Sequence, residues 1–194
     1  MILAYNQLVE YWREKRIRFE PDISKDQIGL SSIDLRLGYV FTWLKQKSGV
    51  VIRPAADGFQ PTDLVVTQDL KTMSIGGKAA PLRLKPGDFV LGQTLESVVI
   101  PADMAAQIQG KSSLARSGLS IHATAPHIHP GFVGTITLEM HNAGPWELEF
   151  EPGRDRVCQM IYLKTTSRVP KKVVDSLATF MGQQAPWPES ARQK

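Results

Sequence analysis

Short apolar stretches separated by turn-forming dipeptides run through most of the chain, and this pattern constrains the fold more than any other feature. The stretches at 33–37, 64–67, 89–94 and 97–100 each have the length of one strand. Pairs drawn from Gly, Pro and Asp punctuate the chain at 57–58, 76–77, 86–87, 130–131, 144–145 and 152–153. Many short strands with frequent turn signals predict a mainly β sandwich or barrel. Long helical patterns do not alternate with the strands, so a doubly wound α/β fold is disfavoured.

One helix is expected close to the start of the chain. Tyr5, Leu8, Val9 and Trp12 recur at helical spacing in a polar background, and Asn6 is a residue type that caps helices. The sequence therefore predicts a short N-terminal helix ahead of the strands.

The length of 194 residues suits one domain with a sizeable core. No apolar run approaches the roughly 20 residues that span a membrane, and the first residues do not read as a signal peptide. We therefore expect a single domain over 1–194, a cytoplasmic location and no membrane partner. The net charge of +4 suits a polyanionic ligand and equally suits a lysine surplus that aids solubility. Clusters of Lys and Arg with aromatic residues are lacking, so nucleic acid is not an expected partner.

The chain has one cysteine, Cys158, which rules out an intrachain disulfide and a cysteine-based zinc site. Zinc deaminases hold their metal with one His and two Cys, or with three Cys. Any deamination by this chain must therefore activate water without that zinc site.

The segment 110–118 combines two glycines, three serines and two cations, Lys111 and Arg116. Backbone N–H groups at glycine, hydroxyl donors and cations are what a phosphate cradle needs. The segment is not a Walker A loop, because Ala105 stands where that motif requires glycine. A polar turn leading into a short helix is the alternative interpretation.

The residues 135–140 alternate between polar and apolar and predict a strand. Ile136, Leu138 and Met140 fall on one face, and Thr135, Thr137 and Glu139 fall on the other. Taken alone, Glu139 is a solvent-facing carboxylate of a strand.

All four histidines lie between positions 122 and 141, and His127 and His129 share one face of an extended segment. Such a pair admits a metal site. No Asp, Glu or Cys stands beside them to complete a ligand set, so separate polar roles are the preferred interpretation.

Several blocks resemble the dCTP deaminase family of the dUTPase-like superfamily. The core blocks are GKSSLAR at 110–116, HATA at 122–125, IHPGF at 128–132 and TLE at 137–139. Further blocks, in the family's order, are SSIDLRLG at 31–38, TLES at 94–97, PAD at 101–103, NAG at 142–144, PG at 152–153, CQMI at 158–161 and FMGQQAP at 180–186. The resemblance covers nearly the whole chain.

The resemblance implies a distorted β-barrel or jelly-roll of the dUTPase-like (β-clip) type. It also implies a homotrimer with active sites between subunits, and a C-terminal arm over 165–194 that closes over the ligand. Mg²⁺ is expected on the nucleotide triphosphate, with no catalytic metal. dTTP is a plausible inhibitor by the same resemblance.

The resemblance assigns roles residue by residue. Glu139 matches the catalytic glutamate, and Ser112 and Arg116 match the residues that frame the cytosine and the attacking water. The substrate-binding positions implied are Lys111, Ser113, Leu114, Ala115, Ala125, His129, Thr137, Leu138, Gln159 and Gln183.

The expected reaction is hydrolytic deamination of dCTP to dUTP and ammonia. Attack on the cytosine ring needs a base for water and an acid for the departing amine, and one carboxyl group, Glu139, can serve both steps. A dUTP diphosphatase or a bifunctional enzyme is the alternative, disfavoured because His129 stands where dUTPases carry aspartate and because Glu139 is present. A non-catalytic nucleotide-binding regulator is the further alternative.

Three positions depart from the family pattern. His129 replaces an aspartate near the sugar, Thr179 replaces a lysine that reaches the phosphates, and Lys172 falls where tyrosine is usual. These departures concern recognition of the sugar and phosphates and leave the catalytic positions unchanged.

Overall fold

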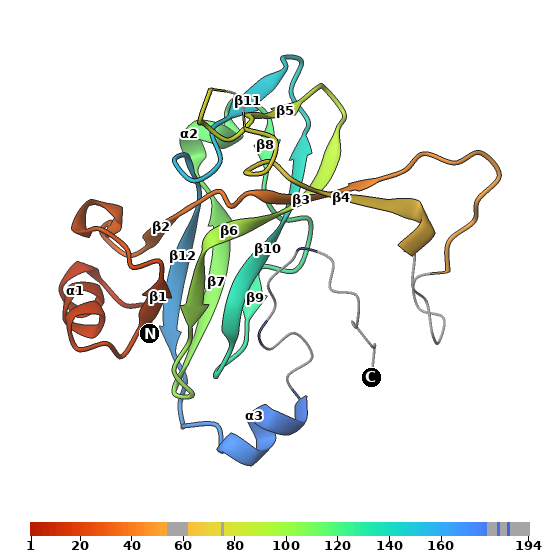
Figure 1. Ribbon diagram of the computed structural model, residues 1–194. Coiled ribbons are helices and arrows are strands. Elements are labelled where there is room, and N and C mark those ends of the chain that lie inside the picture. The colour runs from red at the N-terminus through yellow and green to blue at the C-terminus, as the bar shows by residue number, and fades with distance from the viewer. Residues whose placement is uncertain (54–61, 75, 178–181, 183–185, 187–194) are drawn as a thin grey trace.

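A computed structural model describes residues 1–53, 62–74, 76–177, 182 and 186 (Figure 1). The helices are α1 Tyr5–Arg13, α2 Ser112–Ala115 and α3 Lys171–Leu177, with short 3-10 turns η1 Lys25–Gln27 and η2 Thr62–Leu64. The strands are β1 Arg18–Glu20, β2 Ile33–Arg36, β3 Val40–Leu44, β4 Val65–Asp69, β5 Leu82–Leu84, β6 Phe89–Val99, β7 Met104–Gly110, β8 Leu119–Ser120, β9 His127–Ile128, β10 Val133–Asn142, β11 Leu148–Phe150 and β12 Arg156–Lys164. The predicted mainly β fold with a short N-terminal helix is confirmed.

The N-terminal helix α1 begins directly after Ala4, so Asn6 lies inside the helix and does not cap it. Leu8 and Tyr11 are its buried residues, while Tyr5 is 37% exposed. The apolar face therefore passes through Leu8 and Tyr11, which are three positions apart and lie on one side of a helix.

Two larger sheets share one hydrophobic core. One sheet has the order β4-β3-β6-β10-β8, with β1 also paired to β6, and the other has the order β2-β12-β7-β9. Strands β11 and β5 form a small separate pair. A bridge between Leu37 and Thr94 joins the two larger sheets, and the hydrogen bonds within the described residues do not close a barrel.

The core receives side chains from both larger sheets. Phe41, Val90 and Leu138 come from the first sheet, and Leu35 and Met160 come from the second; all five are fully buried. In β2 and along β10 from Ile136 to Asn142 the buried residues recur at every second position, because successive side chains of a strand point to opposite faces. In the middle of β6, residues 90–94 are buried on both faces.

Strand β6 is the longest and organises the first sheet. The stretches expected as two strands at 89–94 and 97–100 form one strand, because β10 pairs along most of its length and β1 pairs with its far end. The β10 register shifts between Thr135 and Thr137, where the N–H of Ile136 donates to the Thr94 hydroxyl at 3.0 Å. Beyond this bulge, Glu139 lies opposite Leu91.

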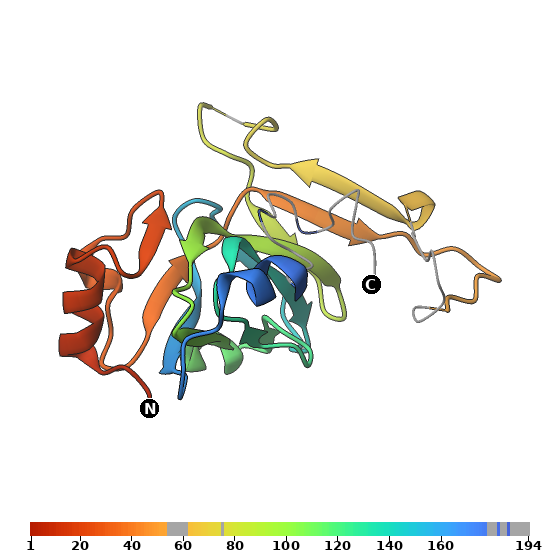
Figure 2. The ribbon, with the colours of Figure 1, turned by 90° about the horizontal axis from the view of Figure 1, so that it is seen from below.

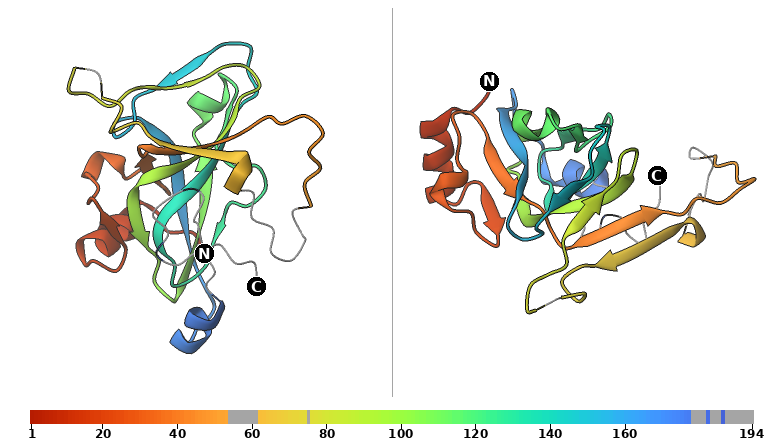
Figure 3. Two further views of the ribbon diagram at one scale, coloured as in Figure 1. Left: turned by 45° about the vertical axis from the view of Figure 1, so that its right-hand side comes forward. Right: turned by 90° about the horizontal axis from the view of Figure 1, so that it is seen from above.

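The β3–β4 hairpin extends beyond the rest of the first sheet, as Figures 1 and 2 show from two directions and Figure 3 from a third. Its strands are antiparallel, and the Thr42 and Thr67 hydroxyls lie within hydrogen-bonding distance at 2.9 Å. Leu44 and Val66 on this hairpin are exposed.

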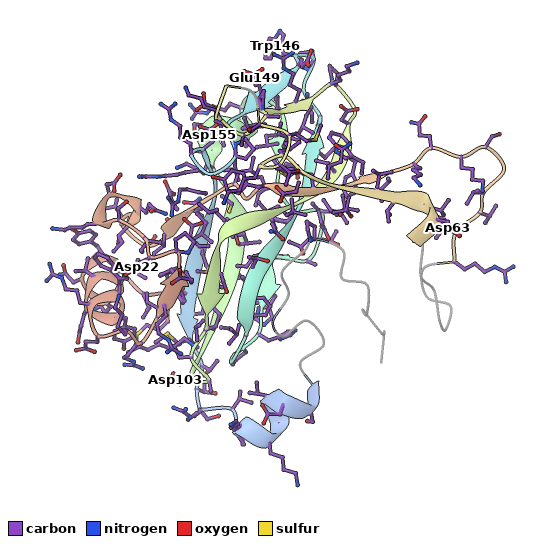
Figure 4. The ribbon with its side chains drawn as sticks, in the orientation of Figure 1. Asp22, Asp63, Asp103, Trp146, Glu149 and Asp155 are labelled. Atoms are coloured by element: carbon purple, nitrogen blue, oxygen red, sulfur yellow. The ribbon has the colours of Figure 1, made fainter. Side chains whose placement is uncertain are left out.

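The segment after β12 returns along the end of the molecule that lies opposite α2 (Figure 1). The N–H of Thr165 donates to the carbonyl of Asp103, and the N–H of Val169 donates to that of Ala102. Asp103, labelled in Figure 4, also accepts a hydrogen bond from Arg16 at 2.8 Å. After α3, the N–H of Gly182 donates to the Val133 carbonyl at 2.7 Å, which places Gly182 beside the start of β10.

Within the described residues, every helix is too short or too polar to cross a membrane.

Candidate active site

The loop 110–118, here called the cradle, connects β7 to β8 through α2. Lys111 precedes α2, and its carbonyl accepts the N–H groups of Leu114 and Ala115. Leu114 packs against the core, while Ser112, Ser113, Ala115 and Arg116 are exposed. The partly buried Leu114 anchors this single turn of helix, while its serines and Arg116 are exposed.

Gly118 ends the cradle at a close contact between two backbone segments. Its φ is +97°, and a Cβ at this position would lie 2.3 Å from the nitrogen of Gly144. Ala143 donates its N–H to the Gly118 carbonyl at 2.9 Å. Only glycine combines this conformation with this approach, so the pair Gly118 and Gly144 holds the cradle against the segment after β10. Trp146, labelled in Figure 4, lies at the same end of the molecule as α2.

Two side chains expected to bind substrate are held by strand β2 and by the end of β7. The ammonium of Lys111 forms an ion pair with Oδ2 of Asp34. The Gln159 amide donates to the Gly110 carbonyl at 3.1 Å and accepts from the Ser32 hydroxyl at 3.0 Å. The entrance to the cradle is thus fixed both at its backbone and at its cation.

Glu139 lies on β10 with its side chain partly exposed. Its Oε2 accepts a hydrogen bond from the backbone N–H of Ala123 at 2.6 Å. Its Oε1 has no hydrogen-bond partner among the described residues. One oxygen therefore fixes the carboxylate, and the other is open to a further partner such as water.

Ile136, Leu138 and Met140 are buried as the alternation on β10 predicts. Thr135 is buried as well, because the bulge turns it inward beside Gln93. Leu138 is fully buried in the core, so only its backbone is available to a ligand. Thr137 is partly exposed.

The segment 121–129 carries the other expected contacts. Ala125 and His129 are exposed, and the rings of His127 and His129 pack edge to face with centroids 4.9 Å apart. His122 Nε2 lies 3.3 Å from the Gln109 amide oxygen, and its Nδ1 is buried without a partner among the described residues. No group of three His, Cys, Asp or Glu within the described residues is arranged to hold a metal ion.

Cys158 lies in the core between β2 and β7. Its side chain is fully buried, its Sγ–H donates to the Leu35 carbonyl at 3.9 Å, and burial raises the pKa of the thiol. The cysteine is a core residue that lies opposite Gly110 in the β12–β7 register.

The structure does not bring all expected residues together. No hydrogen bond or ion pair between Glu139 and either Ser112 or Arg116 is present in the described part of the chain. Gln183 and Thr179 lie outside the described residues, and Lys172 is exposed on α3. Within the described residues, the cradle and the Glu139 carboxylate are thus not joined by any of these contacts.

Sequence reasoning assigned no role to Asp34, Ser32 or Ala123. A weak signal existed for Asp34, because it is a charged residue between Ile33 and Leu35 in a strand whose alternation directs it away from the core. Ala123 contributes a backbone group, for which the residue type gives no signal.

A family model described as dCTP deaminase-like matches residues 2–165. The chain belongs to the dCTP deaminase-like family. This confirms the family suggested by the motifs.

Relatives resemble the chain over most of their length. An enzyme of Dictyoglomus turgidum named dCTP deaminase, dUMP-forming, is 39% identical over 168 residues, covering 86% of this chain and 82% of the relative. An enzyme of the same name from Methanosphaera stadtmanae is 36% identical over 187 residues, which cover 95% of this chain and 91% of the relative. A dCTP deaminase of Rhodospirillum rubrum is 37% identical over 190 residues, which cover 97% of this chain and 95% of the relative.

The crystal structure of 2'-deoxycytidine 5'-triphosphate deaminase from Agrobacterium tumefaciens matches with a TM-score of 0.61 at 23% identity. The match covers 91% of this chain and 51% of that chain. This likeness supports the family fold.

Proposed function

We propose that this member of the dCTP deaminase-like family hydrolyses dCTP to dUTP and ammonia. The observation that carries the proposal is the Glu139 carboxylate, whose Oε2 accepts the Ala123 N–H while its Oε1 has no hydrogen-bond partner among the described residues. A carboxylate held in this way, on a strand bordered by exposed polar segments, suits repeated proton transfer with water.

The proposed mechanism uses Glu139 as base and then as acid. Oε1 takes a proton from water as the oxygen attacks C4 of the cytosine, and the same carboxyl group then protonates the departing amine. The C4–N bond breaks, ammonia leaves, and the remaining proton of the water ends on N3, so the ring carries the C4 carbonyl and the N3–H of uracil. The hydrogen bond from Ala123 keeps the group in one orientation during both transfers.

Ser112 and Arg116 are proposed to frame the base and the attacking water. Because no hydrogen bond or ion pair joins Glu139 to Ser112 or Arg116 in the described part of one chain, we propose that a second subunit of a homotrimer supplies one half of each site. Sedimentation tests this assembly, and a stable, fully active monomer would contradict it.

The remaining contacts are proposed for the rest of the nucleotide. Lys111 and Ser113 would hold the triphosphate together with its Mg²⁺, which enters as part of the substrate. The other proposed contacts are Leu114, Ala115, Ala125, His129, Thr137, Leu138, Gln159 and Gln183. We further propose one domain over 1–194 in which the segment 165–194 closes over the site, a cytoplasmic location, and dTTP as an inhibitor.

A bifunctional enzyme that continues from dUTP to dUMP and pyrophosphate is the second candidate. It is favoured by the relatives named dUMP-forming, among them those of Dictyoglomus turgidum and Methanosphaera stadtmanae. His129, in place of the aspartate that positions water in dUTPases, argues for deamination as the main activity.

Product analysis separates these functions. The purified protein is incubated with Mg²⁺ and either dCTP or dUTP, and the nucleotides are resolved by chromatography while ammonia is assayed. Ammonia and dUTP from dCTP, with dUTP unchanged in the parallel reaction, support the deaminase. Formation of dUMP and pyrophosphate supports the bifunctional enzyme, and two unchanged nucleotides contradict both.

A further inference from the structure

We propose that Asp34 is a positioning residue that holds Lys111 ready for the phosphate chain of the nucleotide. The inference rests on the proposed function insofar as the ligand is a triphosphate. It assigns a role to a carboxylate that would otherwise repel that ligand.

The sheet register places Asp34 beside the cradle. Asp34 on β2 lies opposite Gln159 on β12, and Gln159 lies opposite Gln109 on β7. Ile33 and Leu35 on either side of Asp34 are fully buried, so the alternation of the strand directs the Asp34 side chain to the opposite face. Because β7 ends at Gly110, the next residue, Lys111, reaches Asp34 from two strands away.

Both members of this ion pair are constrained but not sealed from solvent. The Lys111 side chain is 26% exposed and that of Asp34 is 23% exposed. An ammonium group has three donors and Asp34 occupies one of them. Lys111 can therefore bind a phosphate oxygen while it remains bonded to Asp34.

Further hydrogen bonds fix the backbone on both sides of the pair. Gln27, itself buried, donates its amide to the Asp34 carbonyl at 2.9 Å. Gln159 donates to the Gly110 carbonyl, directly before Lys111, and accepts from Ser32. The carboxylate and the start of the cradle are thus held in a fixed relation.

This arrangement matters because a free lysine side chain has many rotamers. Ordering it at the moment of binding opposes affinity, whereas a side chain that is already ordered loses less freedom. Asp34 therefore acts in two opposite ways: it repels the polyanion by charge and it favours binding by positioning the ammonium.

When the charge of Asp34 is removed, the two effects change the affinity for a phosphate chain in opposite directions. If repulsion dominated, D34N would bind a phosphate chain more tightly. If positioning dominates, as we propose, D34N binds more weakly even though a negative charge has been lost. A purely structural role would change the melting temperature and leave the affinity unchanged.

The experiment measures dissociation constants by calorimetry for dCTP, inorganic tripolyphosphate and dCMP, using the full chain. We expect D34N to weaken dCTP and tripolyphosphate binding roughly tenfold and to change dCMP binding little. K111M should weaken the binding of the same two ligands at least as much. The double variant with D34N and K111M should bind them no more weakly than K111M alone. D63N, which removes an equal charge from an exposed carboxylate on η2, is the matched control and should bind like the wild type.

Tighter or unchanged tripolyphosphate binding by folded D34N would overturn the proposal. Additive losses in the double variant would also overturn it, because Asp34 would then act without Lys111. Circular dichroism checks folding; should D34N not fold, D34E replaces it, and unchanged affinity in D34E counts against the proposal because its carboxylate is displaced by one methylene.

The outcome is separable from that of the proposed function. A wild type that binds tripolyphosphate but releases no ammonia from dCTP contradicts the deaminase and still decides the role of Asp34. A wild type that binds neither dCTP nor tripolyphosphate overturns both.

Discussion

The carboxylate of Glu139 and the backbone N–H of Ala123 are joined by a hydrogen bond of 2.6 Å between two segments that are 16 residues apart in sequence. The bond fixes one carboxylate oxygen and orients the other. It also ties β10 to the segment that carries Ala125 and His129, so the geometry of the proposed base depends on that segment.

Replacement of this carboxylate gives the first prediction. We expect E139Q to lower the turnover of dCTP by at least ~10²-fold, because the amide keeps the shape and can accept from Ala123 but cannot take a proton from water. The affinity for dCTP should stay close to that of the wild type. Ammonia release and calorimetry measure the two quantities. E147Q makes the same change on an exposed glutamate and serves as control; full activity in E139Q would remove Glu139 from the mechanism.

The second prediction concerns Glu96, a fully buried carboxylate that accepts from the side chain of Arg36 at 2.7 Å, from its backbone N–H and from Gln27. We expect E96A to reduce the free energy of unfolding by about 3 kcal/mol, the lower end of the range for breaking a buried pair, because Arg36 keeps some contact with water. Urea unfolding measures this. E149A, which breaks the exposed pair with Arg83, should cost about 0–1 kcal/mol. Equal losses in both variants would refute the structural role of Glu96.

The third prediction compares two glycines with similar backbone angles. Gly118 (φ +97°) would place a Cβ 2.3 Å from Gly144, whereas Gly87 (φ +85°) has nothing within 4 Å. G87A should therefore destabilise by roughly 1–2 kcal/mol through conformation alone. G118A should lose more stability and also dCTP turnover, because the cradle must move. Thermal unfolding and assay of both variants test this, and indistinguishable behaviour would count against the close contact.

The fourth prediction follows from Asp26. The Ser24 hydroxyl and the Arg156 guanidinium lower the pKa of Asp26 to about 2. A lowered pKa means that the stabilisation is present above the usual value of ~3.9 and is lost as the pH falls toward 2. We expect D26N to show a smaller fall in the free energy of unfolding between about pH 4 and pH 2 than the wild type does. D63N provides the comparison, and identical slopes in D26N and the wild type would contradict the assignment.

The fifth prediction concerns metal. Dialysis against a zinc chelator should leave dCTP deamination intact once Mg²⁺ is restored, since the only thiol lies in the core. Activity is measured before dialysis, after it, and after addition of Mg²⁺ or Zn²⁺. Recovery that requires zinc would overturn the proposed mechanism.

The sequence predicted the elements whose signals are local. The strand around Glu139 follows from the alternation of Ile136, Leu138 and Met140, and the N-terminal helix follows from helical spacing. The bulge between Thr135 and Thr137 could not be predicted, because there the N–H of Ile136 donates to the hydroxyl of Thr94, which is 42 residues away in sequence.

The residues in contact at the candidate site are even further apart in sequence. Lys111 and Asp34 are 77 residues apart, and Ser32 and Gln159 are 127 apart. Pairings of this kind depend on the order of strands in the sheet, which the composition of each strand does not determine. The motifs were enough to propose the cradle and Glu139 as parts of the site. The residues that hold them in place could be identified only from the folded structure.

Cys158 gives the chain a built-in reporter of its own opening. The thiol is the only one in the sequence, it is fully buried, and burial raises its pKa. The thiolate is the nucleophile that attacks a labelling reagent, so the native protein can be labelled only when β12 separates from its neighbours or the chain unfolds. The labelling rate therefore measures the free energy of that opening at a single known position, without any engineered probe, and a nucleotide that stabilises the fold would slow it.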